Sequence, residues 1–248
     1  MNSNHDSPEP ASKAMRCCRP ILAVLFLNVA SICLASAPSA QTPTGAIENV
    51  GKGWIATIPF AKDGGNSIFL WVAINGQTPG WWAVDSGSSE CIVDRPIVRQ
   101  LGPLTRGSRQ VHGAGKGTVR LDSIKSKVRV EIVGHPRPTC DHFAATNLNS
   151  TVNPGYRAIA GILGYEFFSR YVVRIDFHAH ALQLYDPARF KHEGRGDTVA
   201  LRTVRNIPYV EVRIRTARRP EVTRELIVDT GSEDAVDDSA VRRPWSKP

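Results

Sequence analysis

Hydrophobic and polar residues alternate with the two-residue period of β-strands from about residue 51 onward, in short runs separated by Gly, Pro and Asn. The alternation is clearest at 67–74 and recurs within 119–133. Asn75-Gly76, directly after the first run, is a strong β-hairpin signal. The pattern predicts an all-β fold, and 20 Gly and 17 Pro agree with a turn-rich structure.

The remaining segments of this first part, residues 50–190, carry weaker signals. Strands are expected at 55–60, 81–84, 171–177 and 181–185, a short helix or turn at 91–101, and a polar loop at 146–155. The last two strands are predicted to form a hairpin. These elements together indicate one compact domain.

A polar linker at 187–197 precedes a second, shorter set of strands within 197–248. Residues 209–215 alternate, and 226–228 return after a turn. The order of strand, turn, strand and carboxylate turn seen at 68–88 is thereby repeated at 208–232. We interpret this as an internal repeat of which only the opening strands are present the second time.

Each copy of the repeat delivers a carboxylate on a Gly-containing turn after an apolar strand. The two motifs are Asp85-Ser86-Gly87-Ser88 and Asp229-Thr230-Gly231-Ser232. One such triplet is usually a simple turn, in which Gly supplies a positive φ. Two triplets at matching positions of a repeat favour a functional pair.

Paired carboxylates suit general acid–base chemistry on water. Two carboxylates about one water apart cannot both ionise, so one keeps a proton and the other can activate the water. The two glycines would let the backbones approach, and the hydroxyls of Ser86 and Thr230 would hydrogen-bond across to the opposite turn. The hydroxyls of Ser88 and Ser232 are expected to donate to the outer carboxylate oxygens. The motifs therefore predict a catalytic pair of Asp85 and Asp229.

Two segments resemble known aspartic peptidases. Residues 82–89 (WAVDSGSS) are similar to the active-site motif of pepsin-like and retropepsin-like enzymes, and residues 160–167 (AGILGYEF) are similar to the second signature of bacterial retropepsin-like proteins. The resemblance covers about residues 55–187 as one complete lobe. It implies a retropepsin-like β-barrel lobe, followed at 197–248 by the first strands of an incomplete second lobe.

The resemblance also implies roles for two further groups of residues. In that family an apolar-apolar-Gly segment buttresses the catalytic loop, which here is Ile162-Leu163-Gly164. A substrate-covering flap would contain Gly113, Gly115 and Gly117. The second lobe lacks both features after Asp229, so the chain looks truncated, and the dyad would form either within one chain or from two copies of Asp85 in a homodimer.

The N-terminal residues 1–40 predict a leader with a secretory signal peptide. Arg16 and Arg19 precede an apolar run at 21–27, and small residues follow it. The run is too short for a membrane span, so we expect signal cleavage and a periplasmic or extracellular location. The start could be Met1 or Met15.

Charge and cysteine content refine this hypothesis. The formal net charge is +8, but the basic residues are scattered and are not interleaved with stacking aromatics, so nucleic-acid binding is not expected. Cys91 and Cys140 remain after loss of the leader and could pair, although sequence alone does not fix their separation. The acid–base mechanism needs no metal and no cofactor.

The leading hypothesis is an exported aspartic endopeptidase that cleaves peptide or protein substrates. The alternative is a non-catalytic retropepsin-like module that binds peptides or has a structural role, which the incomplete second lobe would favour.

Overall fold

The computed structural model describes the segments that carry the predicted strands. The described residues are 51–62, 67–77, 79–101, 107–112, 118–124, 129–138, 140, 142–151, 157–193, 196–217, 219–233 and 236. The chain divides into two compact units, residues 1–39 and 40–248, and every described residue belongs to the second. The predicted leader and the flap glycines Gly113, Gly115 and Gly117 lie outside the described residues. None of the helices among the described residues is long and apolar enough to cross a membrane.

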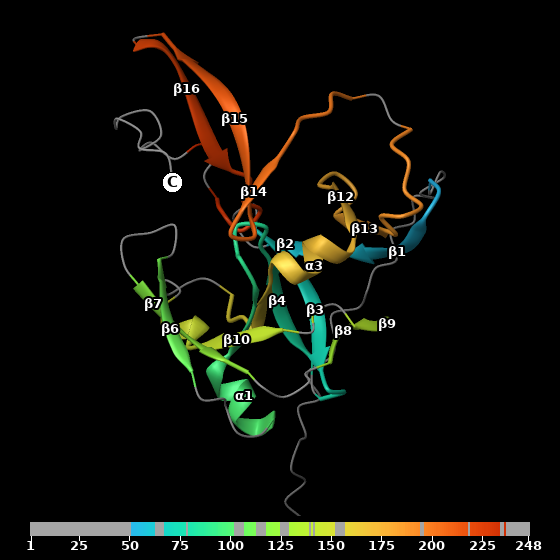
Figure 1. The fold of residues 1–248 in the computed structure, drawn as a ribbon. Coiled ribbons are helices and arrows are strands. Elements are labelled where there is room, and N and C mark those ends of the chain that lie inside the picture. Colours follow the sequence, from blue (N-terminus) through green and yellow to red (C-terminus); the bar gives the residue numbers. More distant parts are fainter. Residues whose placement is uncertain are drawn as a thin grey trace, which may run out of the picture. The chain divides into compact units, whose positions relative to one another are not determined.

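A ten-stranded sheet forms the centre of the second unit (Figure 1). Its strands are β2 (Ala61–Lys62), β3 (Ile68–Ile74), β4 (Gly80–Val84), β5 (Cys91–Asp94), β6 (Ser108–His112), β7 (Thr118–Ser123), β8 (Val130–Ile132), β9 (His135–Pro138), β10 (Phe143–Thr146) and β11 (Gly161–Leu163). The main path runs β6-β7-β10-β5-β11-β4-β3-β8-β9, and β2 pairs with β3. Three short helices interrupt the strands: α1 (Arg95–Leu101), α2 (Leu148–Thr151) and α3 (Tyr165–Arg170). The all-β prediction is confirmed.

The predicted hairpin at Asn75-Gly76 connects β3 to β4. Both turn residues have positive φ, 48° and 70°, as the primed hairpin turns require. In the pairing, Leu70 faces Trp82, and both side chains are fully buried. The apolar positions that alternate in the sequence thus form the core face of this hairpin.

Strand β11 lies between β4 and β5, although it follows them by more than 65 residues. It runs parallel to β4 and antiparallel to β5. The insertion requires very close packing, because a Cβ on Gly161 would come within 2.6 Å of the Trp82 ring and of the Ile92 carbonyl oxygen. Gly164 is equally confined, with the Glu90 carbonyl oxygen 2.1 Å from the position of a Cβ. Only glycine fits at either position.

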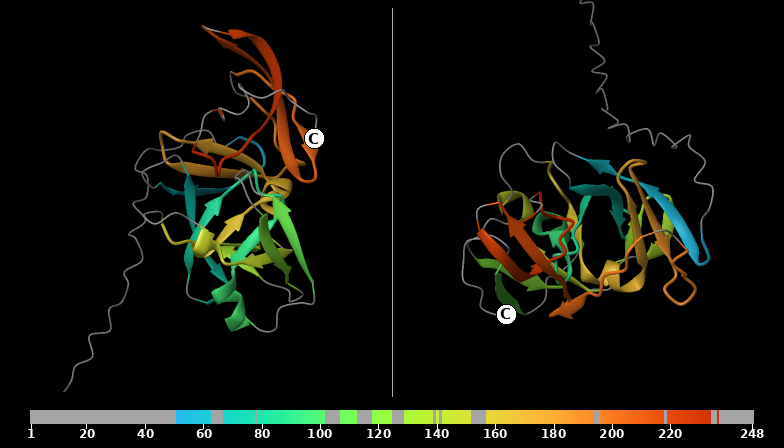
Figure 2. Two further views of the ribbon diagram at one scale, coloured as in Figure 1. Left: turned by 90° about the vertical axis from the view of Figure 1, so that its left-hand side faces the viewer. Right: turned by 90° about the horizontal axis from the view of Figure 1, so that it is seen from above.

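Two smaller sheets complete the described structure. One contains β1 (Trp54–Pro59), β13 (Ala181–Tyr185) and β12 (Val172–Asp176), so the predicted hairpin at 171–185 is confirmed, with β1 added at the outer side of β13. The other contains β14 (Arg202–Val204), β15 (Ile207–Thr216) and β16 (Arg219–Ile227). The last two form the long ribbon drawn in orange and red in Figure 2. The return strand is longer than the predicted 226–228.

Two predictions for the first part of the chain were wrong. Residues 91–94 form a strand before the helix begins, because they fill the place beside β10 and β11. The polar loop expected at 146–155 is replaced at its start by the end of β10 and by α2. The buried Asp94 carboxylate stabilises this helix, since it accepts hydrogen bonds from the Leu148 backbone N–H (2.8 Å) and the Asn149 amide (3.0 Å).

Candidate active site

The two carboxylate turns meet in one chain. The hydroxyl of Ser86 donates to the Val228 carbonyl oxygen (2.6 Å), and the hydroxyl of Thr230 donates to the Val84 carbonyl oxygen (2.8 Å). Each hydroxyl oxygen also accepts the backbone N–H of the other residue, at 3.0 and 3.1 Å. These four hydrogen bonds are the reciprocal contacts that the motifs predict, and they connect residues 142 to 146 positions apart.

Each turn's glycine lies against the opposite carboxyl group. A Cβ on Gly87 would lie 2.5 Å from the Asp229 Cγ, and a Cβ on Gly231 would lie 2.6 Å from the Asp85 Cγ. These separations are far below any van der Waals contact, so the approach of the two turns depends on both residues lacking a side chain. The geometry is symmetric even though the surrounding lobes are not.

The pKa of the Asp85 carboxyl group is shifted by its surroundings. Burial, followed by the charge of Asp229 and a hydrogen bond to its carboxyl, raises the pKa of Asp85 from 3.8 to about 7. The backbone N–H groups of Gly87 and Ser88 oppose this shift but do not cancel it. The Oδ1 atom of Asp85 is buried, and no donor among the described residues lies within hydrogen-bonding distance and angle of it. A proton shared with Asp229 would satisfy that oxygen, which accords with the hydrogen bond that raises the pKa.

The predicted buttress lies directly behind the first turn. The Asp85 backbone N–H donates to the Leu163 carbonyl oxygen (3.0 Å), which continues the parallel pairing of β4 with β11. The N–H of Tyr165 donates to the Ser88 carbonyl oxygen (3.0 Å), while Gly164 fits beneath the loop. Ile162 packs on the opposite face, in a small apolar cluster around Phe69.

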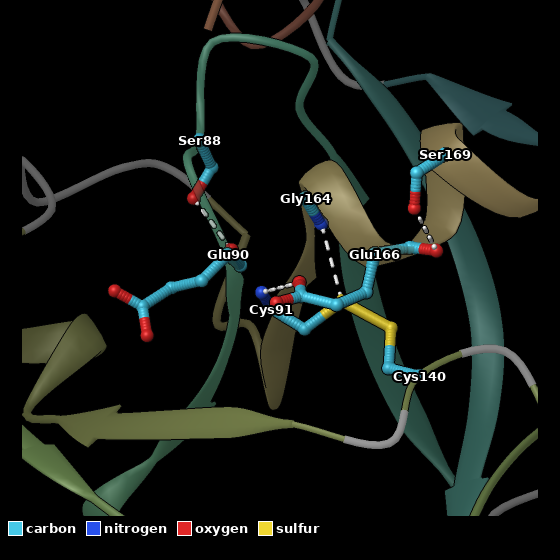
Figure 3. Close-up of a disulfide and its surroundings, with 7 residues drawn as sticks. All are labelled: Ser88, Glu90, Cys91, Cys140, Gly164, Glu166 and Ser169. Carbon is cyan, nitrogen blue, oxygen red and sulfur yellow. Dashed lines mark hydrogen bonds between the residues drawn. A yellow bond between two sulfur atoms is a disulfide. The ribbon is translucent and has the colours of Figure 1, made fainter. Parts of the chain in front are cut away.

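The expected role of Ser88 was wrong. Its hydroxyl donates to the Glu90 carbonyl oxygen at 2.8 Å, so it stiffens the turn from within (Figure 3). The outer carboxylate oxygen of the second turn is instead approached by a backbone group, since the Gly231 N–H donates to Asp229 Oδ1 (2.8 Å). Ser232 is half-buried in the same turn.

Support for the second turn comes mainly from the first turn and the residues around it. The reciprocal hydroxyl contacts hold Thr230, and the Val228 N–H donates to the Pro208 carbonyl oxygen (3.0 Å). The tight turn between β14 and β15 adds a contact, because the Asn206 side-chain amide donates to the Ser89 carbonyl oxygen (3.3 Å). The described contacts of the second turn are therefore made largely with residues 84–89 of the first turn.

Cys91 and Cys140 form a disulfide immediately after the first turn (Figure 3). Both cysteines are fully buried. The Gly164 N–H contacts Cys91 Sγ at 3.4 Å, and the Cys91 N–H donates to the Glu166 carboxylate at 2.7 Å. Burial raises the pKa of Glu166. The disulfide thus ties the end of the catalytic loop to the chain that leads into β10.

The hairpin of β6 and β7 lies where the flap was predicted, although its tip lies outside the described residues. Arg109 on β6 forms an ion pair with Glu90 at the end of the catalytic loop. Asp122 on β7 forms a second ion pair with Arg95 at the start of α1. Neither ion pair could be predicted from the sequence, because nothing in the spacing of these residues indicates that the hairpin returns to the loop.

A metal centre finds no support in the part of the chain that the structure describes. No group of three or more His, Cys, Asp or Glu side chains gathers there.

Part of the chain is similar to known proteins. Residues 71–167 match the family described as aspartyl protease. The match covers less than half of the chain. The matched stretch begins within β3 and ends in α3, so it contains Asp85 and the buttress but not Asp229. The resemblance inferred from residues 82–89 and 160–167 is confirmed, whereas the bacterial and tandem-lobe parts of that interpretation stay predictions.

A solved structure of a retropepsin-like aspartic protease from Rickettsia conorii is also similar to the chain. It shares 19% sequence identity at a TM-score of 0.37, and the match covers 55% of this chain and 100% of that one. No curated protein matches the chain.

Proposed function

We propose that this chain is an aspartic endopeptidase whose dyad is Asp85 and Asp229 of the same molecule. The observation that carries the proposal is the reciprocal packing of each turn's glycine on the other turn's carboxyl group. A structural role alone does not require two carboxyl groups to face one another, because like charges at close range destabilise the fold. The intramolecular approach of Asp229 also favours this pair over two copies of Asp85 in a homodimer.

The proposed mechanism uses one proton shared by the pair. With a pKa of about 7, Asp85 keeps its proton at mildly acidic pH and donates it to the carbonyl oxygen of the scissile peptide bond. Asp229 takes a proton from a water whose oxygen attacks the carbonyl carbon. The tetrahedral gem-diol intermediate then loses its C–N bond as Asp229 passes its proton to the leaving nitrogen and Asp85 takes a proton from one of the two hydroxyl groups. The pair returns to its starting state with one proton.

The substrate would be a peptide in extended conformation beneath the hairpin of β6 and β7. A strand-like substrate can satisfy its backbone groups by pairing with an adjacent strand, and this binding mode is insensitive to most side chains. The ion pair between Arg109 and Glu90 would keep the base of the hairpin in register with the catalytic loop.

The test is cleavage of an unstructured protein or a quenched fluorescent peptide at pH 4 to 7. We expect activity in the wild-type chain, its loss in Asp85→Asn and in Asp229→Asn, and inhibition by a statine-type transition-state mimic. Asp197→Asn is the matched control, because Asp197 is exposed in the linker. Activity retained in Asp229→Asn but lost in Asp85→Asn would move the dyad to a homodimer. Full activity in Asp85→Asn would refute the mechanism.

Export is a separate proposal that depends on the N-terminal sequence. The basic, apolar and small-residue segments of residues 1–40 have the order of a secretory signal. Expression in a bacterial host should yield a periplasmic product that starts after Ala37 or Ala40, as read by N-terminal sequencing. A cytoplasmic product that retains Arg16 and Arg19 would contradict it.

A further inference from the structure

The connection between β13 and β14 lies open to solvent (Figure 1). It begins with a hydrogen-bonded turn, in which the Phe190 N–H donates to the Asp186 carbonyl oxygen (2.9 Å). From 191 to 201 the described residues form neither helix nor strand, and every one of them is exposed. These described residues also make no hydrogen bond and no ion pair with the rest of the described chain. We call residues 191–201 the connecting segment.

Two large apolar side chains stand out of the connecting segment. Val199 is 61% exposed and Leu201 is 54% exposed. Alternate residues of an extended chain point to the same side, so these two side chains would point together, with the small Ala200 side chain opposite. Their transfer from water into another molecule would be favourable, because apolar surface gains free energy when it is buried. The segment therefore offers two apolar anchors on backbone that is already free to pair.

Val133, in the turn between β8 and β9, shows how this differs from exposure alone. Its side chain is 48% exposed, but its N–H donates to the Trp71 carbonyl oxygen (3.0 Å). Backbone that is held in this way must first open locally before a peptidase can bind it in extended form. The connecting segment needs no such opening. Exposed connections of this kind are preferred sites of proteolytic cleavage.

Hydrogen bonds, and no buried apolar core, hold the described chain after the connecting segment in place. The buried hydrophobic residues of the described chain all precede Asp186. The residues after 201 are held by the crossed hydroxyl bonds between the two carboxylate turns and by the bond from the Asn206 amide to the Ser89 carbonyl oxygen. Each such bond replaces a hydrogen bond to water, so it contributes little net free energy.

The connecting segment therefore matters for the dyad. A short flexible connection holds two parts of a chain at an effective concentration on the order of millimolar. A cut would remove this advantage and leave the few hydrogen bonds to hold the second piece. Because Asp229 belongs to that piece, its loss would take one carboxyl group away from the dyad.

We propose that the connecting segment is a cleavage site for a second copy of this chain, and that the cut releases Asp229 and switches the peptidase off. The cut falls within residues 198–201, beside the two apolar anchors. One water is consumed and the C–N bond breaks, so that the carbonyl carbon becomes a carboxyl group and the nitrogen becomes an amine. The inference rests on the proposed endopeptidase function.

The second copy is required because the downstream end of the segment is fixed. Strand β14 begins directly after Leu201, and the turn that follows it is bound through Asn206 to the catalytic loop of the same chain. The segment therefore cannot be drawn across its own dyad without detaching β14. A second copy of the chain meets no such restriction.

The first experiment follows the purified chain at pH 5 by intact-mass spectrometry. We expect two fragments whose junction lies within residues 198–201, and a cleaved fraction per hour that rises about tenfold when the protein concentration is raised tenfold. Asp85→Asn should stay intact alone and should be cut at the same junction after a trace of wild type is added. No cut, a first cut elsewhere after residue 50, or a rate independent of concentration would overturn the proposal.

A variant of the two anchors tests their role. Val199→Asp combined with Leu201→Asp should lower the rate of self-cleavage at least tenfold, while it cleaves a fluorogenic peptide at the wild-type rate, because both side chains are exposed in the connecting segment. Val133→Asp is the matched control and should leave both rates unchanged. Self-cleavage at the wild-type rate in the double variant would refute the role of the anchors.

Size-exclusion chromatography tests the release. The fragment that contains Asp229 should separate from the rest of the chain, and cleavage of the fluorogenic peptide should fall in proportion to the cleaved fraction. Fragments that elute together with full activity would refute the switch.

A foreign peptidase separates this inference from the endopeptidase function. If the wild type cleaves the fluorogenic peptide but leaves its own segment uncut, only this inference fails. If it cleaves neither, the endopeptidase function fails, and a trace of thermolysin added to Asp85→Asn tests the segment alone. A first cut within residues 198–201 followed by separation of the fragments would support the site. A first cut elsewhere after residue 50, or fragments that stay together, would refute it.

Discussion

The raised pKa of Asp85 predicts an unusual pH dependence of stability for the substitution Asp85→Asn. A carboxyl group whose pKa is higher in the folded state than in the unfolded state favours folding only while it is protonated. Its contribution is fully present below pH 3.8 and is lost as the pH rises to about 7. Above pH 7 the folded protein carries a buried charge, and the neutral amide of asparagine removes it.

The shift from 3.8 to about 7 is about three pKa units, and each unit corresponds to about 1.4 kcal/mol. The stabilisation of Asp85→Asn relative to the wild type should therefore be greater at pH 8 than at pH 4 by up to about 4 kcal/mol. An amide is close in shape to a carboxyl group, so packing changes should be similar at both pH values. The difference between the two pH values isolates the electrostatic part.

Urea denaturation followed by tryptophan fluorescence at pH 4, 6 and 8 measures this effect, with the disulfide kept oxidised. Asp197→Asn serves as the control and should change the free energy of unfolding by less than about 0.5 kcal/mol at every pH. Asp229→Asn should lower the pKa of Asp85 by removing the neighbouring charge, although burial still raises it. An Asp85→Asn variant that is destabilised equally at pH 4 and pH 8 would refute the argument.

Three further predictions concern the structure around the dyad. Ser86→Ala removes both hydroxyl hydrogen bonds of its turn and should lower the free energy of unfolding by about 1–3 kcal/mol, measured in urea, together with peptidase activity. Gly87→Ala places a Cβ 2.5 Å from the Asp229 Cγ, so the turns must separate; we expect loss of cleavage with the circular dichroism spectrum retained. Cys140→Ser opens the disulfide, whose cysteines are 49 residues apart, and should cost about 4 kcal/mol of unfolding free energy. Unchanged stability in Ser86→Ala or Cys140→Ser, or full activity in Gly87→Ala, would contradict the respective assignment.

The local structure of the first lobe was largely predictable, because alternation and turn chemistry act over a few residues. The hairpin at Asn75-Gly76 and the hairpin of β12 and β13 were both predicted from sequence and occur in the structure. Short strands without alternation were missed. Residues 143–146 form β10 although all four side chains are buried, and a strand buried on both faces has no polar positions to mark its period.

In the candidate site, too, some features were predictable from the sequence and others were not. The motifs identified both aspartates and the crossed hydroxyl bonds, since the chemistry of a carboxylate pair restricts which residue types can surround it. The ion pair of Arg109 with Glu90 and the position of Arg157 over Trp81 could not be predicted. Each of these two contacts joins residues that are far apart in the sequence. The loops between them follow a path that depends on how the strands pack.

The sequence by itself determined the all-β character, the two carboxylate turns and the glycines beside them, because these follow from side-chain size, charge and period along the chain. Only the tertiary structure decided that β11 inserts between β4 and β5, that Cys91 bonds to Cys140, and that the second carboxylate turn is held by the first. The physical reason is that these features bring together segments distant in sequence. Their free energy comes from close packing and hydrogen bonds that no local pattern encodes.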